Sequence, residues 1–191
     1  MLISHKYKLI FIHIYKNAGT FVRQLLYNLD TNVINAGSHT KAKEAKNQIP
    51  ADIWNNYTKI CVVRNSWDWQ MSLYFYTKGL HTHHQHNIVK DMNVSEYIEW
   101  RKTDLKQQIE FILDNNGDCL VDHIFQFENL NSNIIHFFKE KYNLDVKPYL
   151  PLTKLNSSNR NSDYKIYYNE RDKNLLAEMH EPDIKYFNFK F

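Results

Sequence analysis

The sequence predicts a single α/β domain with three layers, in which a central parallel β-sheet is flanked by helices. Apolar, β-branched runs of strand length alternate along the chain with segments of helical periodicity. This alternation favours a parallel sheet, because each crossover between parallel strands brings a helix onto one face. No repeat and no Pro- or Gly-rich linker marks a boundary. We therefore expect one domain over residues 1–191.

The first half of the chain contains two strand–loop–helix units. LIFIHI, within Lys8–Ile14, is the first expected strand, and FVRQLLYNL after the loop KNAG is the first helix. A second strand is expected at residues 32–36, before a lysine-rich helix that begins around Thr40 and stops at Pro50. YTKICVV, residues 57–63, is a buried strand that leads into the helix WDWQMSLYFY.

The second half is expected to continue the alternation around one long loop. The predicted elements are a polar, histidine-rich loop over 78–91, helices over 94–101 and 104–113, a strand over 119–127, and helices over 132–142 and 170–180. Three helices and one strand therefore follow the loop before the final tail, which contains the last helix.

The composition indicates a globular protein without a nucleic-acid footprint. Hydrophobic residues make up 43% and charged residues 24%, and the net charge of +3 comes without a basic stripe. Cys61 and Cys119 both lie in apolar runs that read as buried strands, so they suggest a reducing compartment and no disulfide framework. The first apolar stretch is too short to span a membrane and lacks a cleavage site. We expect a cytoplasmic protein with no nucleic-acid partner.

The loop from Tyr15 to Thr20 joins a buried strand to a helix, where backbone N–H groups and the helix dipole can receive an anion. Gly19 permits a close backbone approach, and Lys16 adds a positive charge. A plain tight turn is the alternative interpretation. The G-x-x-x-x-G-K-[ST] pattern that would hold magnesium is absent. The loop thus predicts an anion site without an obvious metal.

Arg64 provides a second anchor. It follows the strand 57–63, and ligands of doubly wound sheets bind at the carboxyl ends of the strands, so Arg64 is expected to face the same crevice as the first loop. A surface ion pair is the alternative. Ser72 lies eight residues later, in the following helix.

Together these segments resemble the sulfotransferases that use 3'-phosphoadenosine 5'-phosphosulfate (PAPS), and most of all the carbohydrate branch. HIYKNAGTF is similar to the family's 5'-phosphosulfate loop, and VVRNSWDWQMSLY to its 3'-phosphate motif. GSHTKAKEAK, FQFENL and the closing segments extend the resemblance over most of the chain. It implies a P-loop NTPase-like fold, PAPS as donor and no metal, and a hydroxyl acceptor that is most often on a glycan.

The resemblance also implies roles for individual residues. Lys16 would neutralise the bridging oxygen as the S–O bond breaks, and Arg64 and Ser72 would bind the 3'-phosphate. The residues implied at the donor are Lys16, Asn17, Ala18, Gly19, Thr20, Phe21, Arg64, Ser72 and Arg160. Tyr15, Asn17, Phe21, Ser66 and Trp69 depart from the family pattern. Phe21 either stacks on the adenine or packs into the core.

Transfer to a hydroxyl needs a base, and a histidine has a suitable pKa. His39, which precedes the lysine-rich helix, resembles the catalytic histidine of some glycan sulfotransferases; a capping or surface role is the alternative. Glu44 is a weaker candidate. His13 is expected to be a satisfied interior residue, and Trp67 is expected, like Trp69, to be a helix-packing residue.

The cluster HTHHQH, with His81, His83, His84 and His86, would permit a metal site, but a loop that contacts the acceptor together with Tyr76 is the preferred interpretation. In the tail, Asn156, Ser157 and Arg160 resemble the family's late nucleotide-closing loop, with an exposed loop as the alternative. The rival functions are a non-catalytic nucleotide- or glycan-binding module of the same fold and a phosphoryl-transfer enzyme. The latter lacks a metal-holding acid, because Asp122 falls inside the predicted strand 119–127.

Overall fold

A computed structural model describes residues 1–151 and 160–191, and the chain divides into two compact units. The first unit comprises Met1–Arg64 and Gln108–Leu155, and the second comprises Asn65–Gln107 and Asn156–Phe191. The first unit contains the sheet, and the described part of the second is helical. We describe each unit by itself.

The first unit contains a five-stranded mixed sheet with the order β3-β1-β2-β4-β5. Its strands are β1 (Leu2–Ser4), β2 (Leu9–Ile12), β3 (Ile34–Asn35), β4 (Thr58–Val63) and β5 (His123–Gln126). β2 pairs with β4 in parallel, and so does β4 with β5, whereas β1 runs antiparallel to both β2 and β3. The expected all-parallel sheet is therefore wrong at β1. This short strand returns directly into β2 through a tight turn, which only an antiparallel pair permits.

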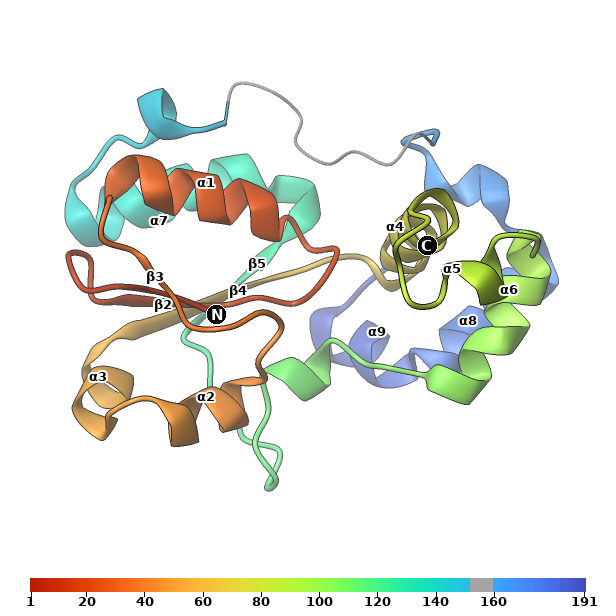
Figure 1. The fold of residues 1–191 in the computed structure, drawn as a ribbon, viewed down its shortest axis with the longest axis horizontal. Helices are drawn as coiled ribbons and strands as arrows, with labels where there is room; N and C mark the ends of the chain where they lie inside the picture. The colour runs from red at the N-terminus through yellow and green to blue at the C-terminus, as the bar shows by residue number, and fades with distance from the viewer. Residues whose placement is uncertain (152–159) are drawn as a thin grey trace. The chain divides into compact units, whose positions relative to one another are not determined.

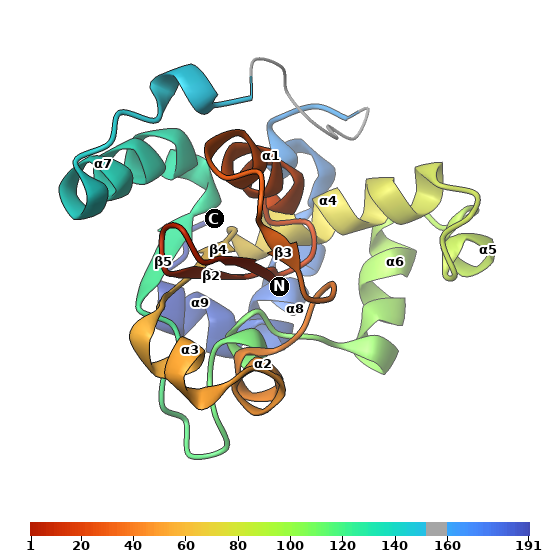
Figure 2. The same ribbon diagram turned by 60° about the vertical axis from the view of Figure 1, so that its left-hand side comes forward.

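Helices cover both faces of this sheet, as the three-layer expectation requires. α1 (Gly19–Leu29) and α7 (Leu130–Tyr142) lie on one face, and α2 (Ala42–Gln48) and α3 (Ala51–Asn56) lie on the other (Figures 1 and 2). Pro50 separates α2 from α3, since proline cannot continue a helix but suits the start of one. The remaining elements of the first unit are single 3₁₀ turns at Ile109–Phe111, Phe127–Asn129 and Lys147–Tyr149.

The core of the first unit lies between the sheet and the α1–α7 layer. Apolar residues spaced by three and four along α1, such as Val22, Leu25 and Leu29, are buried there with Phe11 of β2 and Phe138 of α7. This core packs β2 and β4 against α1 and α7. The carboxyl ends of these two strands carry the residues that the sequence singles out.

The second unit consists of α4 (Ser66–Gly79), α5 (His86–Val89), α6 (Val94–Arg101), α8 (Glu170–Met179) and α9 (Glu181–Phe187), with 3₁₀ turns at Lys102–Asp104 and Tyr164–Tyr167. Its α4 is buried along most of its length, and its buried positions include polar side chains such as Asp68, Gln70 and Ser72 besides apolar ones. Trp67 and Trp69 pack inside this unit, as expected, and the Trp67 indole donates a hydrogen bond to the Lys173 carbonyl.

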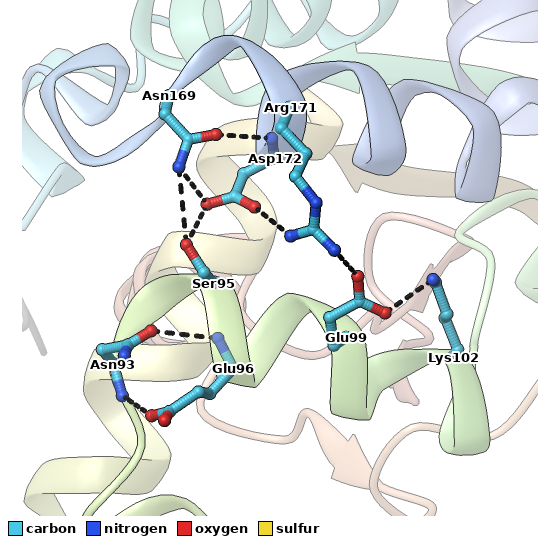
Figure 3. A network of polar contacts seen from close by, with 8 residues as sticks. All are labelled: Asn93, Ser95, Glu96, Glu99, Lys102, Asn169, Arg171 and Asp172. Atoms are coloured by element: carbon cyan, nitrogen blue, oxygen red, sulfur yellow. Dashed lines mark hydrogen bonds and ion pairs between the residues drawn. The ribbon is translucent and has the colours of Figure 1, made fainter.

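A polar network joins α6 to α8 (Figure 3). Ser95 donates a hydrogen bond to the buried carboxylate of Asp172, which Asn169 also contacts at 2.9 Å. On the exposed side, Arg171 pairs with Glu99. The buried carboxylate has hydrogen-bond partners on both helices, and this arrangement stabilises their packing, because leaving a buried acceptor unpaired would be costly.

Most predicted elements are present, with several corrections. Residues 94–101 form α6 as expected, whereas residues 104–113 form only 3₁₀ turns, and the predicted loop 78–91 contains the end of α4 and the short α5. The predicted strand 119–127 is limited to β5, so Asp122 precedes the strand instead of lying inside it. Sequence reasoning missed β1, α3 and α9.

The two cysteines differ in a way that the sequence did not indicate. Cys61 is buried in β4, as expected, but Cys119 is exposed and lies outside the named strands, in an isolated bridge to Leu113. The expectation that both thiols are buried is therefore wrong for Cys119. None of the helices in the described ranges combines the length and the apolar character needed to cross a bilayer.

Candidate functional site

The loop between β2 and α1 has an unusual backbone. Lys16 (φ 62°) and Ala18 (φ 54°) are both in the left-handed region, where non-glycine residues carry strain. Ala18 is the N-cap of α1 and provides no side-chain hydrogen bond to the first turn. A left-handed residue followed by a helix turns successive N–H groups toward one side, which creates an anion-binding concavity. The loop therefore has the backbone form that an anion site needs.

A buried amide network connects this loop to the end of β4. Asn17 is fully buried and donates through Nδ2 to the Val62 carbonyl at 3.1 Å and to Gln108 Oε1 at 2.7 Å. Gln108 is also fully buried, and it accepts from the Arg64 amide at 2.9 Å and donates to the Arg64 carbonyl at 2.8 Å. One glutamine thus links the loop to the backbone of Arg64.

The Arg64 side chain lies at the same place. Its Nη1 donates to the Lys16 carbonyl oxygen at 3.2 Å, and its guanidinium carbon lies 3.9 Å from the ring centre of Phe127. Arg64 is only 8% exposed, so it is not the surface residue of the alternative interpretation. The structure therefore brings the Lys16 backbone and the Arg64 side chain into contact at the end of β4, and a ligand site shared by the loop and Arg64 stays a prediction.

Gly19 is held in close contact with His13. A Cβ atom at position 19 would lie 1.6 Å from Nε2 of His13, far inside van der Waals contact. The packing of the His13 ring therefore requires a glycine at position 19, whether or not the backbone of this loop binds a ligand. Burial lowers the pKa of His13 to about 3, from an ordinary 6.5, and nearby positive charges add to this effect. His13 is neutral at pH 7, as an interior histidine should be.

His39 packs against the same ring. The two ring centres lie 4.5 Å apart, and the ring of Tyr15 meets His39 edge-on at 5.8 Å. His39 itself has a left-handed backbone (φ 59°). Its Nδ1 is 3.3 Å from the His13 carbonyl oxygen. A carbonyl only accepts hydrogen bonds, so this contact requires the proton on Nδ1 and leaves Nε2 with a lone pair.

The environment of His39 favours its neutral form. Partial burial against His13 lowers the pKa of His39, although much of its side chain stays exposed, and the charges of the Met1 amino group and of Arg23 lower it further. A neutral imidazole with a free Nε2 can accept a proton near pH 7. Nε2 of the neutral ring is therefore the nitrogen that carries the lone pair.

The other predicted residues of the loop have more ordinary surroundings. Thr20 is exposed in the first turn of α1. Phe21 is half-buried and packs against the core of the first unit, so the packing alternative is observed and stacking on adenine stays a prediction. Glu44 caps α2 by accepting a hydrogen bond from the Lys41 amide, which gives this carboxylate a structural role.

Ser72 and Arg160 belong to the second unit. Asp68 and Ser72 lie one turn apart on α4, so they share a face of that helix, and Asp68 forms an ion pair with Arg160. The side chains of this pair are 10% and 6% exposed, which makes it a buried pair and not an exposed loop contact. Asn156 and Ser157, predicted with Arg160, lie outside the described residues.

The histidine side chains of the HTHHQH segment, in the second unit, contact one another. Nδ1 of His81 lies 3.1 Å from Nε2 of His86, and His83 stacks on His84. The exposed Tyr76 lies beside His83. Within the described ranges, no three His, Cys, Asp or Glu side chains are arranged to hold a metal ion. A contact between this segment and an acceptor stays a prediction.

Sequence reasoning missed Gln108 and Phe127, and it did not recognise that His13 fits against Gly19. Gln108 lies in the segment that was expected to be a helix, and no motif marks a glutamine as a link between strands. The sequence marks Phe127 only as an aromatic residue directly after the run HIFQ, which does not indicate a contact with Arg64. No family model, no curated protein and no solved structure matches the chain.

Proposed function

We propose that the protein is a PAPS-dependent sulfotransferase of the carbohydrate type, with a P-loop NTPase-like arrangement around β2, β4 and α1. The observation that supports this most is the contact between Arg64 and the Lys16 carbonyl. The two segments that resemble the donor motifs lie 48 residues apart in sequence, yet they meet at one edge of the sheet. Parallel strands place their carboxyl ends at the same edge, where ligands of such sheets bind.

In this proposal the backbone of residues 16–20 receives the 5'-phosphosulfate. The left-handed Ala18 and the uncapped first turn of α1 provide the N–H groups, and Lys16 provides the positive charge. Arg64 binds the 3'-phosphate by charge-assisted hydrogen bonds. Ser72 and Arg160 are assigned to the same phosphate by the resemblance alone, and variants of each test that assignment.

His39 acts as the base. The acceptor hydroxyl oxygen attacks the sulfur, the bond from sulfur to the bridging phosphate oxygen breaks, and the hydroxyl proton moves to Nε2 of His39. 3'-Phosphoadenosine 5'-phosphate leaves with the electron pair of the broken bond, and Lys16 stabilises that developing charge. The Nδ1 contact with the His13 carbonyl keeps Nε2 unprotonated before the reaction.

Labelled donor tests this proposal with a panel of glycans, small alcohols and tyrosyl peptides as acceptors. Wild-type protein should transfer label to a glycan, and Lys16→Ala should lower kcat by about 100-fold or more. His39→Ala should abolish most transfer and leave nucleotide affinity nearly unchanged. His136→Ala is the matched control, because this histidine is exposed on α7 of the same unit.

The outcome also separates the enzyme from a non-catalytic module of the same fold. A protein that binds 3'-phosphoadenosine 5'-phosphate but transfers no label to any acceptor would be a binding module. Full activity in Lys16→Ala or in His39→Ala would remove the corresponding residue from the mechanism.

A further inference from the structure

Gln108 is a buried side chain that makes three hydrogen bonds beside the proposed donor site. Its Oε1 accepts from the Arg64 amide at 2.9 Å and from Asn17 Nδ2 at 2.7 Å, and its Nε2 donates to the Arg64 carbonyl oxygen at 2.8 Å. A backbone N–H only donates and a carbonyl oxygen only accepts, so Arg64 fixes the orientation of this side-chain amide. Gln108 thus pairs with Arg64 as a residue of a neighbouring strand would.

Asn17 extends this contact to the loop between β2 and α1. Its Nδ2 also donates to the Val62 carbonyl at 3.1 Å, and the side chain is fully buried. Its Oδ1 is buried and has no hydrogen-bond partner in the described ranges. An unpaired buried acceptor is unfavourable, and natural proteins tolerate such costs mainly at functional sites. The Asn17 side chain therefore supports the loop from the inside.

The guanidinium of Arg64 is directed from this fixed backbone. Its Nη1 donates to the Lys16 carbonyl oxygen at 3.2 Å, and its guanidinium lies over the ring of Phe127. Arg64 is therefore held at both ends, by Gln108 at its backbone and by Lys16 at Nη1. A long side chain that is already ordered loses less conformational entropy when it binds an anion, so it binds more tightly.

We propose that Gln108 is a positioning residue, which acts through Arg64 and sets how strongly the donor site binds the 3'-phosphate. The inference rests on the proposed function for the identity of the ligand, and Gln108 lies outside both segments that resemble the donor motifs. Gln108 is fully buried, so its influence on a nucleotide must pass through the residues that it contacts. The effect should therefore appear in the difference between nucleotides with and without a 3'-phosphate.

Gln108→Glu changes a single group of this contact. The carboxylate keeps an oxygen for the Arg64 amide and for Asn17, but an oxygen replaces the NH₂ donor that faces the Arg64 carbonyl. The two oxygens repel each other when the carboxyl is ionised, whereas a protonated carboxyl donates to the carbonyl as the glutamine does. Burial raises the pKa of a carboxyl, so a lower pH should restore the contact. Gln107→Glu is the matched control, because Nε2 of Gln107 also donates to a backbone carbonyl, that of Met179 in the second unit, at 2.7 Å.

Calorimetric titrations at about pH 7.5 and about pH 5.5 compare 3'-phosphoadenosine 5'-phosphate with adenosine 5'-phosphate. The measured quantity is the affinity for the first nucleotide divided by the affinity for the second. Partial unfolding weakens both by the same factor and leaves this ratio unchanged. At the higher pH, Gln108→Glu should lower the ratio at least about tenfold relative to the wild type, the loss of about one hydrogen bond to a charged group.

At the lower pH, Gln108→Glu should approach the ratio that the wild type has at that pH, and Gln107→Glu should match the wild type at both. If Gln108→Glu does not fold at the higher pH, Gln108→Met takes its place. That variant removes the amide at similar length, so it should show the loss at both pH values.

An unchanged ratio in the Gln108 variants, an equal loss in Gln107→Glu, or a loss in Gln108→Glu that persists at the lower pH would overturn the proposal. A failure of the proposed function looks different. The wild type itself would then bind neither nucleotide, or would bind both equally. A failure of the positioning role alone leaves the wild-type preference for the 3'-phosphate intact.

Discussion

Replacing Gly19 by alanine should destabilise the protein through one identifiable contact. The new Cβ would lie 1.6 Å from Nε2 of His13, so the ring would have to move by about 2 Å to reach ordinary contact. The movement of the ring is restricted, because the rings of His39 and Phe11 both pack against it, with centres 4.5 and 5.5 Å away. Overpacking of this kind costs about 1–3 kcal/mol, and we expect the upper end.

Thermal unfolding measures this cost. For a chain of this size, about 3 kcal/mol lowers Tm by roughly 6–12 °C. Without the clash, an alanine would be neutral or stabilising in the first turn of a helix. The single variant Gly19→Ala should therefore be clearly less stable than wild type.

The double variant identifies the cause. His13→Ala removes the ring, so Gly19→Ala should cost almost nothing in that background, with a coupling energy of about 2 kcal/mol or more. Additive effects of the two substitutions would refute the reasoning. Titration of the double variant with nucleotide tests a second role of Gly19. If the double variant is as stable as His13→Ala but binds nucleotide more weakly than the wild type, Gly19 also allows the ligand to approach the loop backbone closely.

Three further predictions concern other residues of the first unit. The pKa of His13 is lowered to about 3 in the folded protein, so between pH 6.5 and pH 3 the unfolded state binds more protons than the folded state. The free energy of unfolding should therefore fall as the pH decreases through this range. From pH 7 to pH 5 the loss in denaturant titrations should be about 2 kcal/mol, and His13→Gln should remove most of this loss. Cys119 should react with a thiol reagent in the native protein, whereas Cys61, whose pKa is raised by burial, should react only after unfolding; rapid reaction of both would contradict the burial of Cys61. Gln108→Leu should cost about 2–4 kcal/mol, because it removes three buried hydrogen bonds, one with the Asn17 amide and two with the N–H and carbonyl of Arg64, and a calorimetric loss below 1 kcal/mol would contradict that network.

The elements with strong local signals were predictable from the sequence. α6 lies where it was expected, because Asn93 and Glu96 form a capping box at its start. β2 and β4 are continuous apolar runs, which indicate buried strands. β1 was not predictable in this way, since three residues are too few to establish a period, and its pairing with β2 is tertiary.

The candidate site was predictable only in part. Lys16 and Arg64 follow from the positions of strand ends and from residue chemistry, whereas His39 was singled out by the family resemblance. The structure places all three in the first unit. Gln108 required three-dimensional information, because its role derives from the atoms that it contacts. The segment around Gln108 has a helical pattern in the sequence. Its glutamines are buried and form hydrogen bonds with distant parts of the chain, and the segment forms 3₁₀ turns instead of the expected α-helix.

The most direct test of the central claim compares two nucleotides in thermal unfolding, at fixed salt and with a chelator present. 3'-Phosphoadenosine 5'-phosphate should raise Tm without any metal, by roughly 5–11 °C at 100 times its Kd, because ligand binding at that ratio adds about 2.7 kcal/mol. Adenosine 5'-phosphate at the same concentration should raise Tm less, since it lacks the 3'-phosphate that we assign to Arg64. Equal shifts for the two nucleotides, no shift for either, or a shift that requires magnesium would contradict the proposed donor site.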